Sequence, residues 1–298
     1  NILSQFQPAF EKWPVSSETC YQILEDVETD QEVREQIEHL KIISYHPYQH
    51  IDYVESLARS RFLSGSYRQA IKYLRWTIEE LSSGSQSRRY ATLATYLAYA
   101  GDIEAAERAI SKTSGGLVFS SRSSISHLKF EVYRARGIIA ETRGDLTQAE
   151  TYYRHAIEVT KLNWNYVSSE SRYRASVKLL LARNLMRQGR IIEAETVVRE
   201  VLGYFLRYGL DTFGFKPPEP EVAMSLVRLA EILFEQGRYV DAQDITRIAI
   251  HLYRAVCVPS DNINLIKAQN LIGKSLVAQE HWNEAIAQYE AIRSGMAS

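Results

Sequence analysis

The chain has 298 residues, of which 45% are apolar and 24% are charged, with 35 basic and 36 acidic side chains. This composition is typical of a globular protein and excludes collagen-like, disordered and disulfide-stapled classes. The formal net charge of -1 argues against a protein that works mainly by coating nucleic acid or an anionic membrane, because such proteins carry a strong basic excess.

Cysteine use and hydropathy indicate the cellular compartment of the protein. Cys20 and Cys257 form neither a CxxC motif nor a Cys/His metal spacing. No apolar run approaches the roughly 18 residues of a membrane-spanning helix, and the first residues lack the pattern of a signal peptide. We therefore expect a cytoplasmic protein that does not associate with a membrane.

Residues 1–46 differ in character from the rest. They contain Pro8, Pro14 and a Ser-rich turn, followed by a helical pattern over Asp30–His46. After Pro47 the next proline is Pro217, and the stretch between them can be continuously helical because proline interrupts helices. Apolar residues there recur at three and four positions, the period of an amphipathic helix. No convincing alternating strand pattern occurs, so the sequence predicts an all-α fold.

One short phrase punctuates these helices. It is a glycine followed two residues later by a bulky apolar residue and five residues later by alanine. A glycine can end one helix in a left-handed cap, and the small alanine lets the next helix pack closely. The copies are Gly65 to Ala70, Gly101 to Ala106, Gly144 to Ala149, Gly189 to Ala194, Gly237 to Ala242 and, without the glycine, Glu280 to Ala285.

The phrase resembles the helix-turn-helix unit of the tetratricopeptide repeat family. Small residues also stand seven positions before each turn, at Ala58, Ala94, Gly137, Ala182, Ala230 and Gly273. The turn alanines are 36 to 48 residues apart, against about 34 for the standard repeat. In this respect the chain is similar to kinesin light chains and to bacterial regulatory sensor domains. The resemblance implies a right-handed α-solenoid of about six repeats.

The predicted organisation is therefore one continuous solenoid over residues 47–298, preceded by a helical cap or degenerate repeat over 1–46. A cap is expected because a terminal repeat needs a partner for its apolar face. Two inter-repeat stretches, Thr113 to Ser124 and Gly209 to Glu221, are predicted to be loops. An open solenoid end also allows self-association, so a homo-oligomer is one expectation.

No enzymatic motif stands out. Gly273, Lys274 and Ser275 imitate the end of a phosphate loop, but Ala268 replaces its first glycine and no strand precedes it. His46 and His50 are four residues apart, yet Pro47 separates them, so a solvent-facing or capping pair is favoured over a metal site. We expect no enzyme activity, no cofactor and no metal.

Charge is distributed unevenly along the chain. Residues 1–60 have 4 basic and 11 acidic side chains, whereas residues 121–210 have 15 basic and 9 acidic ones. One interpretation is an ordinary solvated surface with ion pairs such as Glu195 with Arg199. The alternative is a site for an acidic ligand, because arginine binds carboxylates and phosphates bidentately.

The resemblance implies where such a site would lie. In the family the first helices line a concave groove, and the residues about 2, 6, 10 and 13 positions before each turn point into it. Both signs of charge fall at these positions, including Glu55, Glu131 and Glu231, but the middle of the groove is predicted to be basic. The predicted partner-binding residues are Arg59, Arg88, Tyr99, Arg134, Arg183, Arg187, Arg228, Lys267, Asn270 and Lys274.

These observations favour a protein-interaction scaffold that binds an extended or helical, acidic protein segment in the groove. A second hypothesis is a regulatory domain of a larger signalling protein that senses a small effector or a peptide, in keeping with a chain that begins at Asn1. A third is single-stranded nucleic-acid binding through Arg172, Tyr173 and Arg174, which the pI of 6.7 disfavours.

Overall fold

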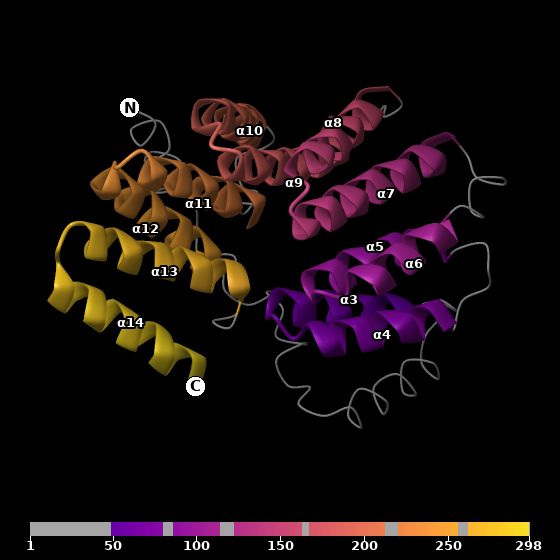
Figure 1. Cartoon of the computed structure of the whole chain (residues 1–298), viewed down its shortest axis with the longest axis horizontal. Coiled ribbons are helices and arrows are strands. Elements are labelled where there is room, and N and C mark those ends of the chain that lie inside the picture. Colours follow the sequence, from indigo (N-terminus) through magenta and orange to yellow (C-terminus); the bar gives the residue numbers. More distant parts are fainter. Residues whose placement is uncertain are drawn as a thin grey trace. The chain divides into compact units, whose positions relative to one another are not determined.

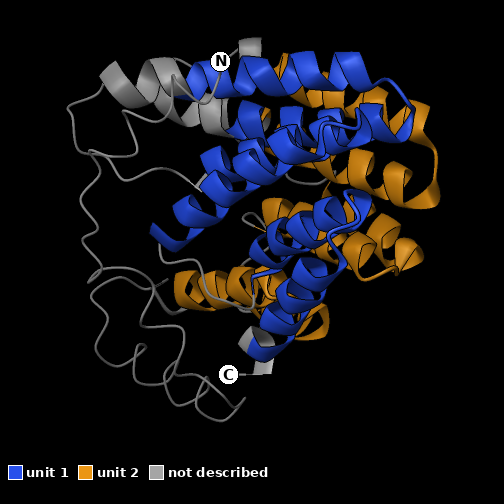
Figure 2. Cartoon of the chain, turned by 90° about the vertical axis from the view of Figure 1, so that its left-hand side faces the viewer, with its two compact units in different colours: residues 1–20, 166–298 blue, residues 21–165 orange. Residues whose placement is uncertain are grey.

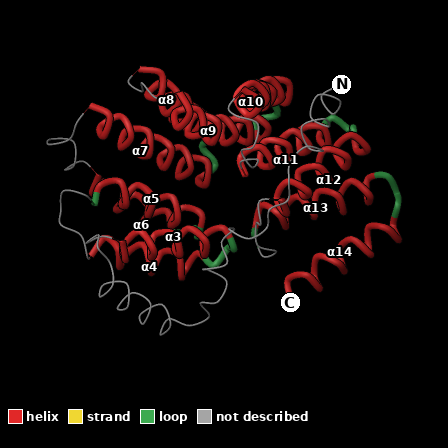
Figure 3. The backbone as a smooth tube through the Cα atoms, turned by 180° about the vertical axis from the view of Figure 1, so that it is seen from behind, coloured by secondary structure: helices red, strands yellow, loops and turns green. Residues whose placement is uncertain are grey.

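The computed structural model describes residues 49–79, 86–113, 122–162, 167–211, 220–255 and 262–297. Within these ranges every regular element is a helix (Figure 3). The chain divides into two compact units, residues 21–165 (unit 2) and residues 1–20 with 166–298 (unit 1), which Figure 2 colours separately. The predicted cap over residues 1–46 lies outside the described ranges.

Unit 2 contains three helix pairs (Figure 1). In each pair a short glycine turn joins two helices that pack against each other, and α5 also packs against α4 and α7. The pairs are α3 (Gln49–Leu63) with α4 (Tyr67–Glu79), α5 (Ser87–Tyr99) with α6 (Ile103–Ser111), and α7 (Arg122–Arg143) with α8 (Leu146–Leu162).

Unit 1 repeats the arrangement. Its first helices contact each other in sequence, α9 with α11 and α11 with α13. The pairs are α9 (Val167–Arg187) with α10 (Ile191–Asp211), α11 (Pro220–Glu235) with α12 (Tyr239–Ala255), and α13 (Ile263–Ala278) with α14 (Trp282–Ala297). The six predicted helix-turn-helix units are therefore all present.

Helices extend into the ends of both predicted loops, so the loops are shorter than expected. α7 begins at Arg122, α10 continues to Asp211 and α11 begins at Pro220, while residues 114–121 and 212–219 lie outside the described ranges. Proline suits the first position of a helix, because its missing N–H would have no helical partner there. Long helices take up much of the extra repeat length, since α7 has 22 residues and α9 and α10 have 21 each.

The glycine turns have the predicted geometry. Gly144 has a φ of +89°, and the next amide, of Asp145, donates to the carbonyl of Ala140 at 3.0 Å. This is the hydrogen-bond pattern of a Schellman cap. The sixth turn keeps the pattern without glycine, because His281 N donates to Leu276 O at 3.0 Å while Glu280 takes a φ of +62°.

The small residues of the repeat are buried at the helix crossings, as the packing argument requires. The six turn alanines are at most 3% exposed: Ala70, Ala106, Ala149, Ala194, Ala242 and Ala285. Gly137 lies under the ring of Tyr153, and a Cβ at that position would stand only 2.6 Å from Tyr153 Cδ1. Gly273 lies in the same way under Tyr289, whose Cζ would be 2.6 Å from an added Cβ. A side chain at either glycine would therefore collide with the neighbouring helix.

The last helix has a different surface from the others. On α14, Trp282 and Ile286 are each 57% exposed and Tyr289 is 39% exposed. Only Ala285 and Ile292 are buried among its described side chains. α14 therefore presents an apolar face to solvent.

Candidate functional site

All ten predicted binding residues lie on the first helices of their pairs. In unit 2 these are Arg59 on α3, Arg88 and Tyr99 on α5, and Arg134 on α7. In unit 1 they are Arg183 and Arg187 on α9, Arg228 on α11, and Lys267, Asn270 and Lys274 on α13. Each set is described within its own unit.

In unit 2 an aromatic cluster joins α3, α4 and α5. Phe62 stacks on Tyr96 with ring centroids 4.2 Å apart and a 9° angle between the planes. Tyr99 meets the edge of Phe62 at 5.3 Å, and Tyr67 lies 6.4 Å from Tyr99. Burial raises the pKa of Tyr67, and Tyr99 raises it further. These rings fix the ends of α3 and α5 relative to each other.

Charged side chains from three helices surround Tyr96. Burial raises the pKa of Tyr96 to about 12; Arg59 and Arg134 act against this rise, and Glu55 and Glu131 add to it. The phenol therefore stays protonated at neutral pH, and α3, α5 and α7 bring cations and carboxylates to one place. We call Glu55, Arg59, Tyr96, Glu131 and Arg134 the Tyr96 cluster.

The Tyr96 cluster has mixed charge, as the carboxylates Glu55 and Glu131 at the predicted groove positions indicate. Arg134 Nη2 lies 2.6 Å from Glu131 Oε2, and Glu55 pairs with Arg89 of α5. By contrast, Arg59 and Arg88 are exposed and have no ion-pair partner in the part of the chain that the structure describes. Two arginines thus remain available to an external anion.

His127 extends the Tyr96 cluster along α7. Burial lowers the pKa of this imidazole, Glu131 raises it, and Arg88 lowers it. Arg88 at the start of α5 therefore acts on the same region as Glu131. Only the packing of α5 on α7 connects His127 with Arg88, so spacing along the sequence gives no signal for this contact.

In unit 1 the predicted residues lie on α9, α11 and α13. Arg228 pairs with Glu231 on the same helix, and both act on Tyr253 of α12, whose pKa burial raises. On α9, Arg183 is half-buried and Arg187 is exposed; on α13, Lys267 and Lys274 are exposed and Asn270 is half-buried.

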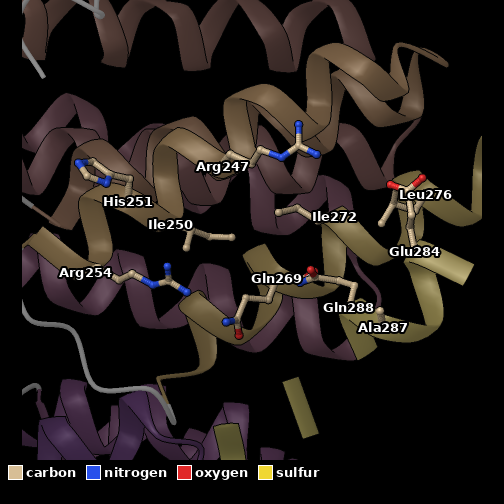
Figure 4. A pocket seen from close by; sticks show the side chains of 10 residues that line it. All are labelled: Arg247, Ile250, His251, Arg254, Gln269, Ile272, Leu276, Glu284, Ala287 and Gln288. Carbon is tan, nitrogen blue, oxygen red and sulfur yellow. The ribbon is translucent and has the colours of Figure 1, made fainter. Parts of the chain in front are cut away.

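Unit 1 also contains a groove that the sequence analysis missed. It has a volume of about 670 Å³ and lies between α12 and α14, with residues of α13 also lining it (Figure 4). Arg247, His251 and Arg254 line it from α12, and Glu284 and Gln288 line it from α14. The available signal was the spacing of four and three between the basic residues of α12, which places them on one helical face.

The described residues offer no alternative chemistry of the kinds considered above. No group of three or more potential metal-ligating residues occurs among them. Gly273 to Ser275 lie inside α13, where Ser275 Oγ donates to Leu271 O at 2.8 Å, so this segment forms no phosphate loop. His46 lies outside the described ranges. In those ranges no helix is long and apolar enough to span a membrane.

The paired helices, glycine turns and buried alanines define an α-helical repeat protein. A tetratricopeptide repeat family model matches residues 179–255, from the second half of α9 to the end of α12. The resemblance inferred from the turn phrases is therefore confirmed. No curated protein matches the sequence.

Solved structures show the same fold at low sequence identity. The Signal Transduction ATPase with Numerous Domains protein with a tetratricopeptide repeat sensor from Pyrococcus horikoshii matches with a TM-score of 0.56 and 15% identity, over 91% of this chain and 42% of that one. BtubC (BKLC) from P. vanneervenii matches with a TM-score of 0.53 and 16% identity, over 80% and 91% of the two chains. Aspartyl phosphate phosphatase F from Bacillus subtilis matches at 0.50 and 15% identity, over 90% and 75%.

Proposed function

We propose that this chain is a protein-interaction scaffold whose first-helix face in unit 2 binds an acidic segment of a partner protein. The observation that carries the proposal is the Tyr96 cluster with its neighbour Arg88: exposed Arg59 acts on the buried phenol of Tyr96, and exposed Arg88 acts with Glu131 on His127. Tetratricopeptide-type repeats present such a face on neighbouring first helices, so that a bound segment contacts several repeats at once.

The chemistry favours carboxylates as the recognised groups. A free guanidinium presents a planar fork of donors that matches a carboxylate in two hydrogen bonds. The internal Arg134–Glu131 pair is already formed, so a ligand gains most from Arg59 and Arg88. Glu55 and Glu131 repel excess negative charge, which favours a segment with separated carboxylates over a dense polyanion.

A charge-reversal experiment tests this function. Fluorescein-labelled peptides with spaced glutamates and their glutamine counterparts are titrated against the whole chain, and fluorescence anisotropy measures binding. We expect the glutamate peptides to bind at least 10-fold more tightly, and Arg59→Glu with Arg88→Glu to remove this difference. The matched control is Arg68→Glu with Arg75→Glu, which changes the same charge at two exposed positions of the second helix α4.

The control variant distinguishes binding at Arg59 and Arg88 from a long-range effect of the protein's charge. If both double variants weaken binding equally, long-range charge explains the result and the proposed site is wrong. If neither weakens it while both keep their helical circular dichroism, the first-helix face of unit 2 does not bind the segment.

A second candidate is a regulatory sensor domain that binds a small effector. The observation in its favour is that 91% of this chain matches 42% of a protein described as having a tetratricopeptide repeat sensor. Thermal unfolding with fractions of a cell extract above and below about 1 kDa separates the two candidates. A ligand that binds only the folded state raises the midpoint of thermal unfolding. A midpoint raised only by the small-molecule fraction favours the sensor, and a midpoint raised only by the protein fraction favours the scaffold.

A further inference from the structure

The groove formed by α12, α13 and α14 consists of residues of unit 1 alone. Its walls come from two second helices, α12 and α14. Figure 4 shows Arg247, His251 and Arg254 along α12, with Gln269 on α13 and Gln288 on α14. All three basic side chains are exposed, while Ile250, Ile272 and Leu276 of the lining are at most 8% exposed. A ligand would therefore meet the exposed basic side chains together with apolar surface.

Unit 2 has a groove at the corresponding place, which serves as an internal comparison. It has a volume of about 430 Å³ and is lined by α6, α7 and α8. There Arg143 Nη1 of α7 lies 2.7 Å from Glu107 Oε1 of α6, so an internal ion pair bridges two of the lining helices. Of the two arginines that line this groove, Arg136 and Arg143, the second already has a carboxylate.

The groove of unit 1 lacks that bridge. The positions that correspond to Glu107 and Arg143, counted from the turns, are Gln243 and Gln279. Gln279 donates to the carbonyl of Ser275 in its own helix at 2.9 Å, and the buried Nε2 of Gln243 has no hydrogen-bond partner in the described structure. Two amides thus replace the ion pair that spans the groove of unit 2.

The two arginines of this groove have no ion pair that spans it. Arg254 has no ion-pair partner among the described residues. Arg247 Nη1 lies 3.1 Å from Asp244 Oδ1 of the same helix, and this pair, like the similarly exposed Arg143–Glu107 pair, is a surface pair that exchanges readily. Glu284 is the one acidic side chain in the lining, on the opposite wall. The α12 wall is therefore electrostatically complementary to an anion.

We propose that the groove between α12 and α14 is a second docking surface, which binds an acidic peptide segment of a partner protein. Arg254 and Arg247 bind carboxylates, His251 lies between them, and the amides of Gln269 and Gln288 pair with the peptide backbone. Arg247 and Arg254 are seven residues apart, which is about 10 Å along a helix axis. Three residues of a polyproline II segment make one turn and span about 9 Å, at about 3.1 Å each, so carboxylates spaced by three residues lie on one side and match the two arginines.

The open form of the groove favours a peptide over a small molecule. Pockets for small ligands enclose most of the ligand surface, whereas three exposed basic residues along α12 leave this groove open on that side. A peptide lies along such a wall and keeps its other face in water. The inference does not depend on the Tyr96 cluster, because no residue is shared between the two surfaces.

The test uses the whole chain with Arg59→Glu and Arg88→Glu as background, so that binding at unit 2 does not contribute. The probe is a fluorescein-labelled ten-residue peptide with glutamates at positions 3, 6 and 9 on a Gly/Ser/Leu background, titrated to about 1 mM. We expect Arg254→Glu to weaken binding about 10-fold. Arg293→Glu, at an exposed position of α14 outside the groove, is the matched control and should change binding less than 2-fold.

A reciprocal probe keeps the test valid if a variant is destabilised. The same peptide with lysines in place of glutamates should bind the Arg254→Glu variant more tightly than the Arg254 protein. The proposal is overturned if the glutamate peptide does not bind at 1 mM, or if Arg254→Glu and Arg293→Glu weaken it equally. It is also overturned if a single-stranded oligonucleotide or inorganic phosphate binds with the same dependence on Arg254 while the peptide does not.

Discussion

The third repeat, α7 with α8, and the sixth, α13 with α14, use the same pair of residues in different surroundings. In both, a glycine seven positions before the turn lies under a tyrosine nine positions after it. Tyr153 is fully buried and donates its hydroxyl to Glu141 Oε2 at 2.7 Å, whereas Tyr289 is 39% exposed. The close approach of the two helices therefore accounts for the glycine in both repeats, and burial of the ring is a separate property.

The turns of these two repeats make a second comparison. Gly144 and Glu280 both occupy the left-handed region, with φ of +89° and +62°, and both turns close with the same backbone hydrogen bonds. Only glycine adopts this conformation without steric cost. The hydrogen-bond pattern thus determines the turn, and the sixth repeat carries a strain that the third avoids.

The largest expected effect comes from placing a methyl group under each ring. Gly137→Ala forces the buried ring of Tyr153 to move and disturbs its hydrogen bond, so we expect the free energy of unfolding to fall by about 3 kcal/mol. Gly273→Ala meets the outer end of an exposed ring, which can swing away, while alanine improves helix propensity by about 1 kcal/mol. Urea unfolding followed by circular dichroism measures both. Equal losses would contradict the role given to ring burial.

Removing the hydroxyl of each tyrosine tests the same difference in ring burial between the two repeats. Tyr153→Phe leaves the buried carboxylate of Glu141 with one donor fewer, and we expect a loss of about 1–2 kcal/mol. Tyr289→Phe should change stability by less than about 0.5 kcal/mol, because surface substitutions away from special features usually do. Hydrogen exchange of the α7 and α13 amides assigns each effect to its repeat, and a loss confined to α13 would refute the comparison.

The smallest effect concerns the turns. Glu280→Gly should stabilise the sixth repeat by about 1 kcal/mol, because it removes a side chain from the left-handed region. Gly144→Ala should destabilise the third repeat by about the same amount, although Gly144 has open space around its Cα. Thermal unfolding of the two variants measures the opposite signs. A lower midpoint for Glu280→Gly would show that the Glu280 side chain makes a stabilising contact.

Local sequence signals predicted the repeats well. The glycine phrase located all six turns, including the sixth, where Glu280 replaces glycine, and the alanines marked the helix crossings. These features follow from neighbours along the chain. The mixed charge of the Tyr96 cluster also follows in part from the sequence, because Glu131 and Arg134 are three positions apart and helix geometry allows them to pair.

The groove of unit 1, by contrast, was not predicted. Its walls combine side chains from α12 and α14, whose separation depends on how α13 packs between them. The Phe62–Tyr96 stack depends in the same way on the packing of α3 against α5. Whether these clusters form depends on tertiary packing, so a repeat pattern read from sequence contains no direct signal for them.

The limited burial of α14 has a consequence for ligand affinity. This helix buries two of its described side chains, Ala285 and Ile292, whereas α12 buries eight residues. Helices with few buried contacts open locally at low free energy. Each opening removes one wall of the groove, and the apparent affinity for a groove ligand falls with the closed fraction. A ligand that bridges α12 and α14 would thus slow amide exchange in α14, and a substitution that anchors α14 would tighten binding without touching the ligand.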